Sequence, residues 1–296
     1  MKRVFLFMVM AVAVVFTSCD STKNLAKTEQ SAQQAFDNGD YATALSQWEE
    51  VINAYKQQDA VNKCPVYTDA GVAAYKLGQT DKAIEYLKQA DWSEFQKEDT
   101  YLTLAKIYRQ KDNLSLELVN LEEYLKKFPN GKEREEVQRR LFELYAESDN
   151  FEKAVKLWDN NAASYEQDTN MLSLYLQINE KLKNDSVCFG LSEKLLSLDE
   201  NNTSALAWLS NYYFWKAEKN YQKEMKAYEQ HKTRKQYAHL LKELKKVTVD
   251  YKKSLEYAKR LYKIEPSAKT ASLLAKCYTR LDDKKKAAYY KKLSKQ

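Results

Sequence analysis

Glycine and proline are scarce in this chain, which has 5 Gly and 3 Pro among 296 residues. Sheet proteins place turn-forming residues about every 8 to 12 positions, and this chain cannot supply them. So few glycines also leave almost no room for the glycine-rich loops that hold phosphate groups. The scarcity therefore predicts an all-α protein of long helices joined by short turns.

Histidine and catalytic motifs are scarce as well. The chain has 2 His, at His231 and His239, and no GxSxG, HExxH, P-loop or GxGxxG motif occurs. Its His, Cys and carboxylate residues do not cluster at the spacing of metal ligands. We therefore expect a protein that is not an enzyme and that holds neither a metal nor a cofactor.

The single long apolar run lies at the start of the chain. Residues 4–16 follow two basic residues, a pattern typical of a secretory signal, and the run is shorter than the about 20 residues that a membrane span needs. The run leads into "FTSC", which resembles a bacterial lipoprotein signal. The resemblance implies a signal peptide over residues 1–18, acyl chains such as palmitate on Cys19, and a lipidated tether over residues 19–24. A simple secretory signal is the alternative.

Three further cysteines, Cys64, Cys188 and Cys277, show no CxxC spacing. In an exported protein they could form one disulfide and leave one free thiol. Alternatively they are small apolar residues buried in helices, and this interpretation is favoured.

A helix–turn–helix pattern recurs along the chain. The segments "NGDYATALSQWEEVI", "LGQTDKAIEYLKQA" and "SDNFEKAVKLWDNN" each place an Ala after a polar turn and a large apolar residue four positions later. These pairs are Ala44 with Trp48, Ala83 with Leu87, and Ala154 with Trp158. The segments before each turn carry apolar residues three and four apart, which marks a helix face. We infer that the small residues let two helices pack closely.

The spacing of this pattern resembles the tetratricopeptide repeat (TPR). Gly71 and Ala105 are 34 residues apart, and Gly71, Ala83 and Ala90 match the small residues of one TPR motif. The resemblance implies an all-α, TPR-like helical solenoid of antiparallel helix pairs. The repeats are placed near residues 25–58, 64–97, 98–131, 135–168, 169–203 and 268–296. Of these, residues 25–203 would form a solenoid of about five repeats, and residues 267–296 a C-terminal TPR-like helix pair.

One repeat departs from the motif in its core. Glu117 stands where the other repeats have a small residue. We expect Leu116 or Leu118 to make the helix contact in its place.

Another repeat is interrupted, over residues 204–266. Its first helix begins at Ser204, but the expected ending of its second helix arrives only at Pro266. The inserted segment has no Gly or Pro, so we expect one helix to about residue 230, a turn at "HKTRK" and a second helix over 236–264. The second helix would be roughly 43 Å long. The two would form a long basic helical hairpin, an insertion near the C-terminus.

Charge is unevenly distributed between the two parts of the chain. Residues 20–215 carry 22 Lys and Arg against 33 Asp and Glu, whereas residues 216–296 carry 24 against 9. The basic hairpin is interpreted as a docking arm for an acidic partner or for anionic lipid head groups. A merely solvated helical face is the alternative. Nucleic acid is not an expected partner, because the signal directs the chain to export.

Candidate partner-binding residues lie in two places. The TPR resemblance places the first helix of each repeat in a binding groove, where Lys106, Arg109 and Arg139 would form a small basic spot. The arm adds Lys223, Lys226, Arg234 and Lys235. Solvent-exposed charges without a ligand are the alternative.

The tryptophans divide into two groups. Trp48, Trp158 and Trp208 fall on core positions of the repeat. Trp92 lies in a turn and Trp215 near the base of the arm, so these two are candidate surface contacts that could stack on a sugar.

The combined features resemble TPR lipoproteins of Bacteroidetes-type bacteria. They predict a membrane-tethered, noncatalytic scaffold in the bacterial cell envelope, with the outer membrane facing the periplasm as its expected location. Its partners would be envelope proteins or peptides, bound through the TPR groove and the arm. An adaptor for cell-wall enzymes and a glycan-binding lipoprotein of a nutrient-uptake system are the alternatives.

Overall fold

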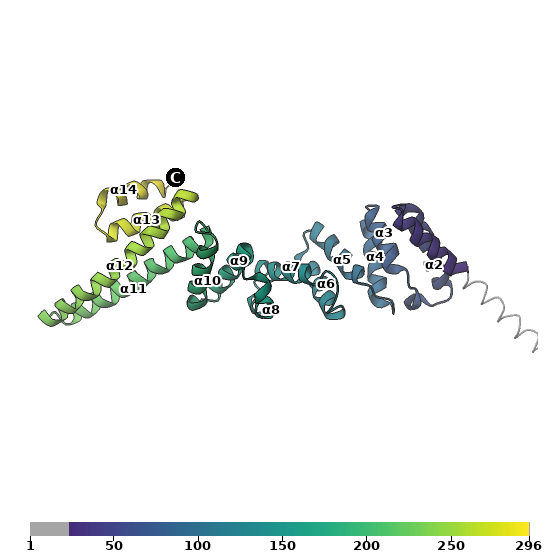
Figure 1. Cartoon of the computed structure of the whole chain (residues 1–296), viewed down its shortest axis with the longest axis horizontal. Helices are drawn as coiled ribbons and strands as arrows, with labels where there is room; N and C mark the ends of the chain where they lie inside the picture. The colour runs from purple at the N-terminus through teal and green to yellow at the C-terminus, as the bar shows by residue number, and fades with distance from the viewer. Residues whose placement is uncertain (1–23, 296) are drawn as a thin grey trace, which may run out of the picture. The chain divides into compact units, whose positions relative to one another are not determined.

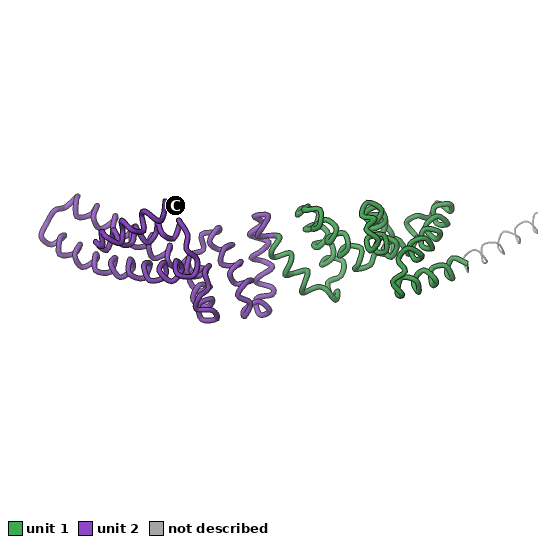
Figure 2. The backbone as a smooth tube through the Cα atoms, turned by 90° about the horizontal axis from the view of Figure 1, so that it is seen from above, with its two compact units in different colours: residues 1–144 green, residues 145–296 purple. Residues whose placement is uncertain are grey.

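A computed structural model describes residues 24–295 of the chain, which are helical apart from turns and short connections (Figure 1). The helices are one over residues 24–37, α2 (Tyr41–Gln57), the 3-10 helix η1 (Val61–Lys63), α3 (Tyr67–Lys76), α4 (Thr80–Trp92), α5 (Glu98–Gln110), α6 (Leu114–Lys127), α7 (Arg134–Glu147), α8 (Phe151–Tyr165), α9 (Thr169–Lys181), α10 (Asp185–Leu198), α11 (Thr203–Gln230), α12 (Arg234–Ile264), α13 (Ala268–Arg280) and α14 (Lys284–Leu293). The chain divides into two compact units, one ending at Leu144 and one starting at Tyr145 (Figure 2).

Each unit is built from helix pairs that are consecutive in the chain. In the first unit α3 packs on α4 and α5 packs on α6; in the second, α9 packs on α10, α11 on α12, and α13 on α14. A short turn joins the two helices of each pair, so they run antiparallel. This arrangement confirms the predicted all-α fold of TPR-like helix pairs.

Six turns between consecutive helices share one backbone conformation, which the α11–α12 turn lacks. A residue with positive φ ends the first helix at six turns, at Gly39, Gly78, Asp112, Asp149, Lys183 and Asp282. The N–H of the following residue then donates to a carbonyl five residues earlier, as from Gln79 to Ala74 and from Asn113 to Tyr108, both at 2.9 Å. This pattern is the Schellman ending of a helix. Its recurrence shows that the repeat exists in the backbone as well as in the side chains.

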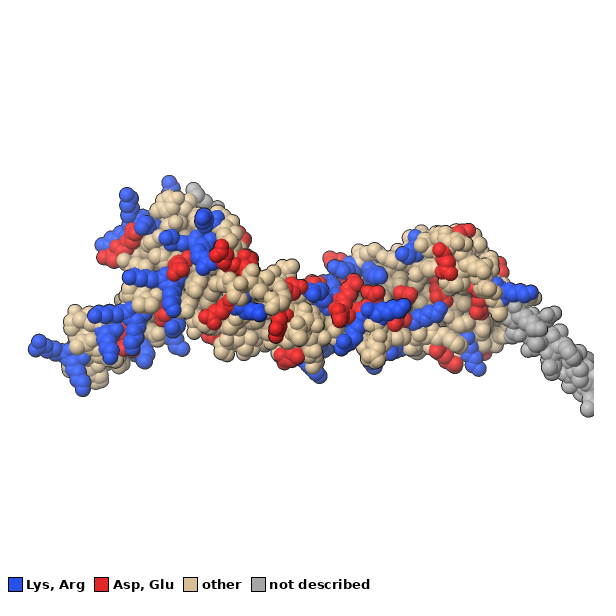
Figure 3. Space-filling model, viewed as in Figure 1, with Lys and Arg blue, Asp and Glu red and all other residues tan. Residues whose placement is uncertain are grey.

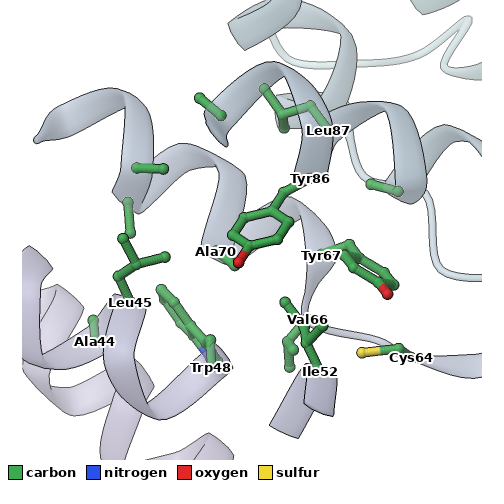
Figure 4. Packing of buried hydrophobic residues seen from close by; sticks show 14 of the residues in the cluster. Ala44, Leu45, Trp48, Ile52, Cys64, Val66, Tyr67, Ala70, Tyr86 and Leu87 are labelled. Carbon is green, nitrogen blue, oxygen red and sulfur yellow. The ribbon is translucent and has the colours of Figure 1, made fainter. Parts of the chain in front are cut away.

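The small residues lie where the paired helices meet. A Cβ added to Gly71 on α3 would lie 2.6 Å from Cγ of Leu87 on α4. Ala44, Ala83 and Ala154 are fully buried. Figure 4 shows the surrounding core, in which Trp48 of α2 and Tyr86 of α4 flank Ala70 of α3. The prediction that small residues allow close helix packing is confirmed.

The tryptophans follow the predicted division. Trp48, Trp158 and Trp208 are buried, whereas Trp92 is 82% exposed and Trp215 is 60% exposed.

The expectation for the third repeat is wrong. Leu116 is exposed and Leu118 is only half-buried, whereas Glu117 itself is 1% exposed. Glu117 can be buried because Arg140 of α7 pairs with its carboxylate. The position is therefore buried as in the other repeats, but its side chain forms an ion pair with α7.

Cys64, Cys188 and Cys277 are buried free thiols, as the favoured interpretation holds, although Cys64 lies between η1 and α3 and not in a helix. Burial raises the pKa of each thiol to about 11. The signal peptide and Cys19 lie outside the described residues.

The α11–α12 hairpin is the longest pair of the second unit, with helices of 28 and 31 residues. Ser254 Oγ donates to the Ser210 carbonyl at 2.7 Å where the two helices meet. Leu273, Leu274 and Cys277 of α13 pack against the hairpin. That the hairpin is an insertion within a repeat stays a prediction, as do the predicted domain boundaries.

Candidate protein-binding site

A groove of about 180 Å³ lies in the first unit where α5, α6 and α7 meet. Helix α5 contributes Leu102, Ala105, Lys106 and Arg109, α6 contributes Glu117 and Leu121, α7 contributes Glu136, Val137 and Arg140, and Glu133 immediately precedes α7. Leu102, Ala105 and Lys106 share one face of α5 because they are three and four residues apart. The groove thus combines an apolar lining with charged side chains.

An ion pair of low exposure belongs to this groove. Arg140 Nε lies 2.7 Å from Glu117 Oε1, and Nη2 lies 3.0 Å from Oε2, so the contact is bidentate. The side chains are 16% and 2% exposed. Arg140 also donates to Glu143 at 3.0 Å. Such a planar, doubly bonded contact holds both groups in a fixed geometry.

Two exposed walls of opposite charge flank this pair. Lys106 and Arg109 stand on α5, and Glu133 and Glu136 stand at the start of α7. Opposite charges on facing walls select the direction of a bound peptide more than they raise its affinity.

The predicted basic spot is brought together in part. Lys106 and Arg109 line the groove, whereas Arg139 of α7 is half-buried and is not a lining residue. Arg140 lines it instead. The buried Glu117–Arg140 pair was missed by the sequence analysis, although Glu117 was noticed as an anomaly, because its partner lies 23 residues away.

The arm residues Lys223, Lys226, Arg234 and Lys235 are all exposed near the free end of the α11–α12 hairpin. Figure 3 shows Lys and Arg side chains gathered over this end. Lys223 lies 3.6 Å from Glu224, and the other three make no ion pair with a residue that the structure describes. Two nearby carboxylates have partners, since Glu224 lies 3.1 Å from His239 and Glu243 lies 2.8 Å from Lys246, whereas Glu229 is exposed. Residues 223–246 carry 8 Lys and Arg against 3 Glu, so the end of the hairpin keeps a net positive charge.

A second hollow, of about 420 Å³, lies in the second unit. It is lined by Glu180, Asp185, Trp208, Asn211, Tyr212, Trp215, Lys216 and Lys219. Within residues 24–295, no three His, Cys, Asp or Glu side chains gather as a metal site would require. Over the same residues, no helix has the length and apolar character needed to cross a bilayer.

Comparison with known proteins finds similarity in structure. No protein-family model and no curated protein matches the chain. A crystal structure from Bacteroides ovatus, described as that of a candidate protein-binding protein, is 18% identical, with a TM-score of 0.51 over 64% of this chain and 99% of its own.

Two solved structures of TPR proteins cover more of the chain. One, from Parabacteroides merdae, is 14% identical and has a TM-score of 0.42 over 92% of both chains. The other is the C-terminal part of a TPR repeat-containing protein of Cytophaga hutchinsonii, which is 19% identical and has a TM-score of 0.46 over 90% of this chain and 93% of its own.

The recurring Schellman turns and the buried small residues of the chain itself define a helical-repeat fold of the TPR type. Stacked helix pairs of this kind present extended surfaces for binding other proteins.

Proposed function

We propose that the chain is a noncatalytic scaffold that binds proteins or peptides of a bacterial cell envelope. In this proposal lipid on Cys19 tethers the chain to the outer membrane, where it faces the periplasm. Partners bind in the α5–α7 groove, and the basic end of the α11–α12 hairpin supplies a second contact.

The groove is the observation that carries this proposal. Its apolar floor lies between the cations Lys106 and Arg109 and the carboxylates of Glu133 and Glu136. A peptide segment offers apolar side chains for the floor and charged side chains for both walls. The buried Glu117–Arg140 pair supports the proposal because it keeps the lining rigid before a partner arrives, which reduces the ordering cost of binding.

Photo-crosslinking in cells tests the groove. A photoreactive amino acid at the exposed position of Glu136 should capture one or a few envelope proteins, identified by mass spectrometry. The Lys106→Glu/Arg109→Glu variant should lose most of this capture. Lys56→Glu/Lys88→Glu is the matched control, because it makes the same charge change at exposed positions of the same unit outside the groove. Equal capture by both variants, or no capture by the natural sequence, would contradict the proposal.

The tether has its own test. Cells fed a palmitate analogue should label the natural chain and leave Cys19→Ser unlabelled, and the variant should leave the membrane fraction. An unlabelled natural chain would disprove lipidation and would leave the proposal of protein binding in the groove unaffected.

Charge reversal at the end of the hairpin tests the second contact. Lys226→Glu, Arg234→Glu and Lys235→Glu together should weaken capture of an acidic partner, and the loss should shrink as salt is raised. A partner captured equally well by this variant at low salt would show that the hairpin takes no part.

A further inference from the structure

The hollow in the second unit is built on one face of α11. Trp208, Tyr212 and Trp215 lie at spacings of four and three residues, so their side chains share a face. Asn211, Lys216 and Lys219 lie on the same face. Glu180, at the end of α9, and Asp185, at the start of α10, lie opposite them. The volume of about 420 Å³ falls in the range of small-molecule sites, which are about 300–1,000 Å³.

An exposed indole is the most unusual part of this hollow. Trp215 is 60% exposed, although every Å² of apolar surface left in water forgoes about 25 cal/mol of stabilisation. The ring is nonetheless held in place, because Phe214 packs edge-on at 5.4 Å and Lys276 Nζ lies 5.9 Å from its centroid. It is therefore a supported flat surface that stays largely open to solvent, with the Lys276 ammonium near one face.

A second aromatic surface adjoins Trp215. Tyr212 stacks on the buried Trp208 with ring centroids 4.8 Å apart and an interplanar angle of 17°. Phe189 of α10 contacts Tyr212 at 5.9 Å. Two of the three rings in the hollow, Trp215 and Tyr212, therefore reach solvent from a supported position.

Polar groups surround the rings and offer both donors and acceptors. Asn211 Nδ2 donates to the Ala207 carbonyl at 2.9 Å, which leaves Oδ1 as an acceptor. Lys216 is held by Asp250 at 3.2 Å. The side chains of Glu180, Asp185 and Lys219 form no hydrogen bond or ion pair with any residue described. Hydrogen-bonding capacity therefore remains available in the lining of the hollow around Trp215.

The charge of the side chains that line the hollow indicates which class of ligand fits it. The lining has two cations, Lys216 and Lys219, and two carboxylates, Glu180 and Asp185. Beside it, Asp250 pairs with Lys216 and Lys276 lies near Trp215, so positive and negative charges remain equal in number. A nucleotide or an acidic peptide would meet two carboxylates, and a basic peptide would meet two ammonium groups. A neutral ligand avoids both penalties. One face of a sugar ring is apolar and stacks on an indole, while its hydroxyl groups both donate and accept hydrogen bonds.

We propose that this hollow binds a neutral oligosaccharide, with one sugar ring stacked on Trp215 and its hydroxyl groups bonded to Asn211, Glu180 and Asp185. The site is independent of the protein-binding groove in the first unit. It gives the chain a carbohydrate ligand in addition to its protein partners.

Titration calorimetry of the full-length protein tests the proposal, in a detergent whose headgroup is not a sugar. The probes are cellohexaose, maltohexaose, xylohexaose and chitohexaose. At least one should bind, and Trp215→Ala should weaken its binding at least tenfold, whereas Trp215→Phe should retain part of it. Trp92→Ala is the matched control, because Trp92 is an exposed indole outside the hollow.

The outcomes separate this proposal from the scaffold function. Lys106→Glu/Arg109→Glu should bind the oligosaccharide as the natural sequence does, and circular dichroism should show that Trp215→Ala keeps its helices. Binding that is equal in Trp215→Ala and Trp92→Ala would overturn the assignment of the site. Failure of all four probes to bind the natural sequence would overturn the proposed ligand class, and the protein-binding groove would be unaffected.

Discussion

Arg140 of α7 holds the carboxylate of Glu117 of α6 with two hydrogen bonds, at 2.7 and 3.0 Å. Glu117 occupies the position that Ala83 and Ala154 occupy in other repeats. At this position the side chain thus forms an ion pair with α7 of the next repeat, whereas Ala83 and Ala154 are fully buried small residues.

Removing one partner of this ion pair should lower the free energy of unfolding more than removing both partners. Arg140→Leu leaves the Glu117 carboxylate buried without its partner, which typically costs about 3–5 kcal/mol. Glu117→Ala/Arg140→Leu removes the charge as well and restores the small residue of the repeat. We expect the double variant to melt at a higher temperature than Arg140→Leu, as measured by circular dichroism. A double variant that is less stable than the single one would show that the pair supports the packing in some other way.

Substitution by Ala at two helical glycines should change the stability of the chain in opposite directions. Gly71→Ala places a Cβ 2.6 Å from Cγ of Leu87, so α3 and α4 must separate, and overpacking of this kind costs about 1–3 kcal/mol. Gly190 on α10 has no atom within 4 Å of such a Cβ. Gly190→Ala should therefore stabilise the chain by about 0.5–1 kcal/mol through its helix propensity. Urea denaturation checks both values, and destabilisation of equal size at both sites would exclude the packing explanation.

The helix pairs could be predicted because their signals are local. The Ala44–Trp48 and Ala83–Leu87 spacings lie within single helices, and the polar turns before them contain the residue of positive φ that ends each first helix. The buried tryptophans were predictable for the same reason, since Trp48 and Trp158 stand at fixed distances from a small residue. The spacing of small and large apolar residues in the sequence therefore predicts both the repeat and the residues of its core.

The binding surfaces could be predicted only in part, because they combine residues that are far apart in the chain. The sequence shows Glu117 as an anomaly but does not show that Arg140 satisfies it. It shows Trp215 near the arm, but Glu180 and Asp185 reach the same hollow from other helices. Such groups meet only through the stacking of the helices, which no local spacing records.

The three buried thiols should be unreactive in the folded chain. Burial raises the pKa of Cys64, Cys188 and Cys277 from the ordinary 9.0 to about 11, and only the thiolate reacts with alkylating agents. At pH 8, iodoacetamide should therefore modify them only after unfolding, and mass spectrometry of digested peptides measures this.

The raised pKa values of these three thiols also predict how stability changes at alkaline pH. The folded pKa lies above the unfolded one, so the contribution of these thiols is complete below pH 9 and is lost as the pH rises from 9 towards 11. The melting temperature should fall over this range. Replacing Cys64 with Ala should remove its share of the fall. An unchanged slope would show that tyrosines, such as Tyr67 with its pKa raised to about 12, dominate.

Acid should loosen α13 and α14 from the hairpin. Glu218 of α11 accepts hydrogen bonds from Arg280 Nη2 at 2.8 Å and from Tyr251 Oη at 2.7 Å. Burial raises the pKa of Glu218, but these two hydrogen bonds, the charge of Arg280 and a hydrogen bond from Gln222 together outweigh burial and leave the pKa below its ordinary 4.5. Because the folded pKa is lowered, the stabilisation is present above pH 4.5 and is lost as the pH falls through the folded pKa.

Hydrogen exchange of the α13 and α14 amides measures this loosening. At pH 7, Glu218→Gln should speed exchange several-fold, because a hydrogen bond to a charged group contributes about 1.5–3 kcal/mol when buried and less at this partly exposed site. After correction for intrinsic rates, the difference from the natural sequence should shrink as the pH falls below 4.5 and the Glu218 carboxylate becomes protonated. Glu229→Gln, at an exposed position of the same helix with no ion-pair partner among the described residues, is the control and should change exchange little. A difference that stays constant from pH 7 to pH 3 would mean that the charge of Glu218 does not hold α13 in place.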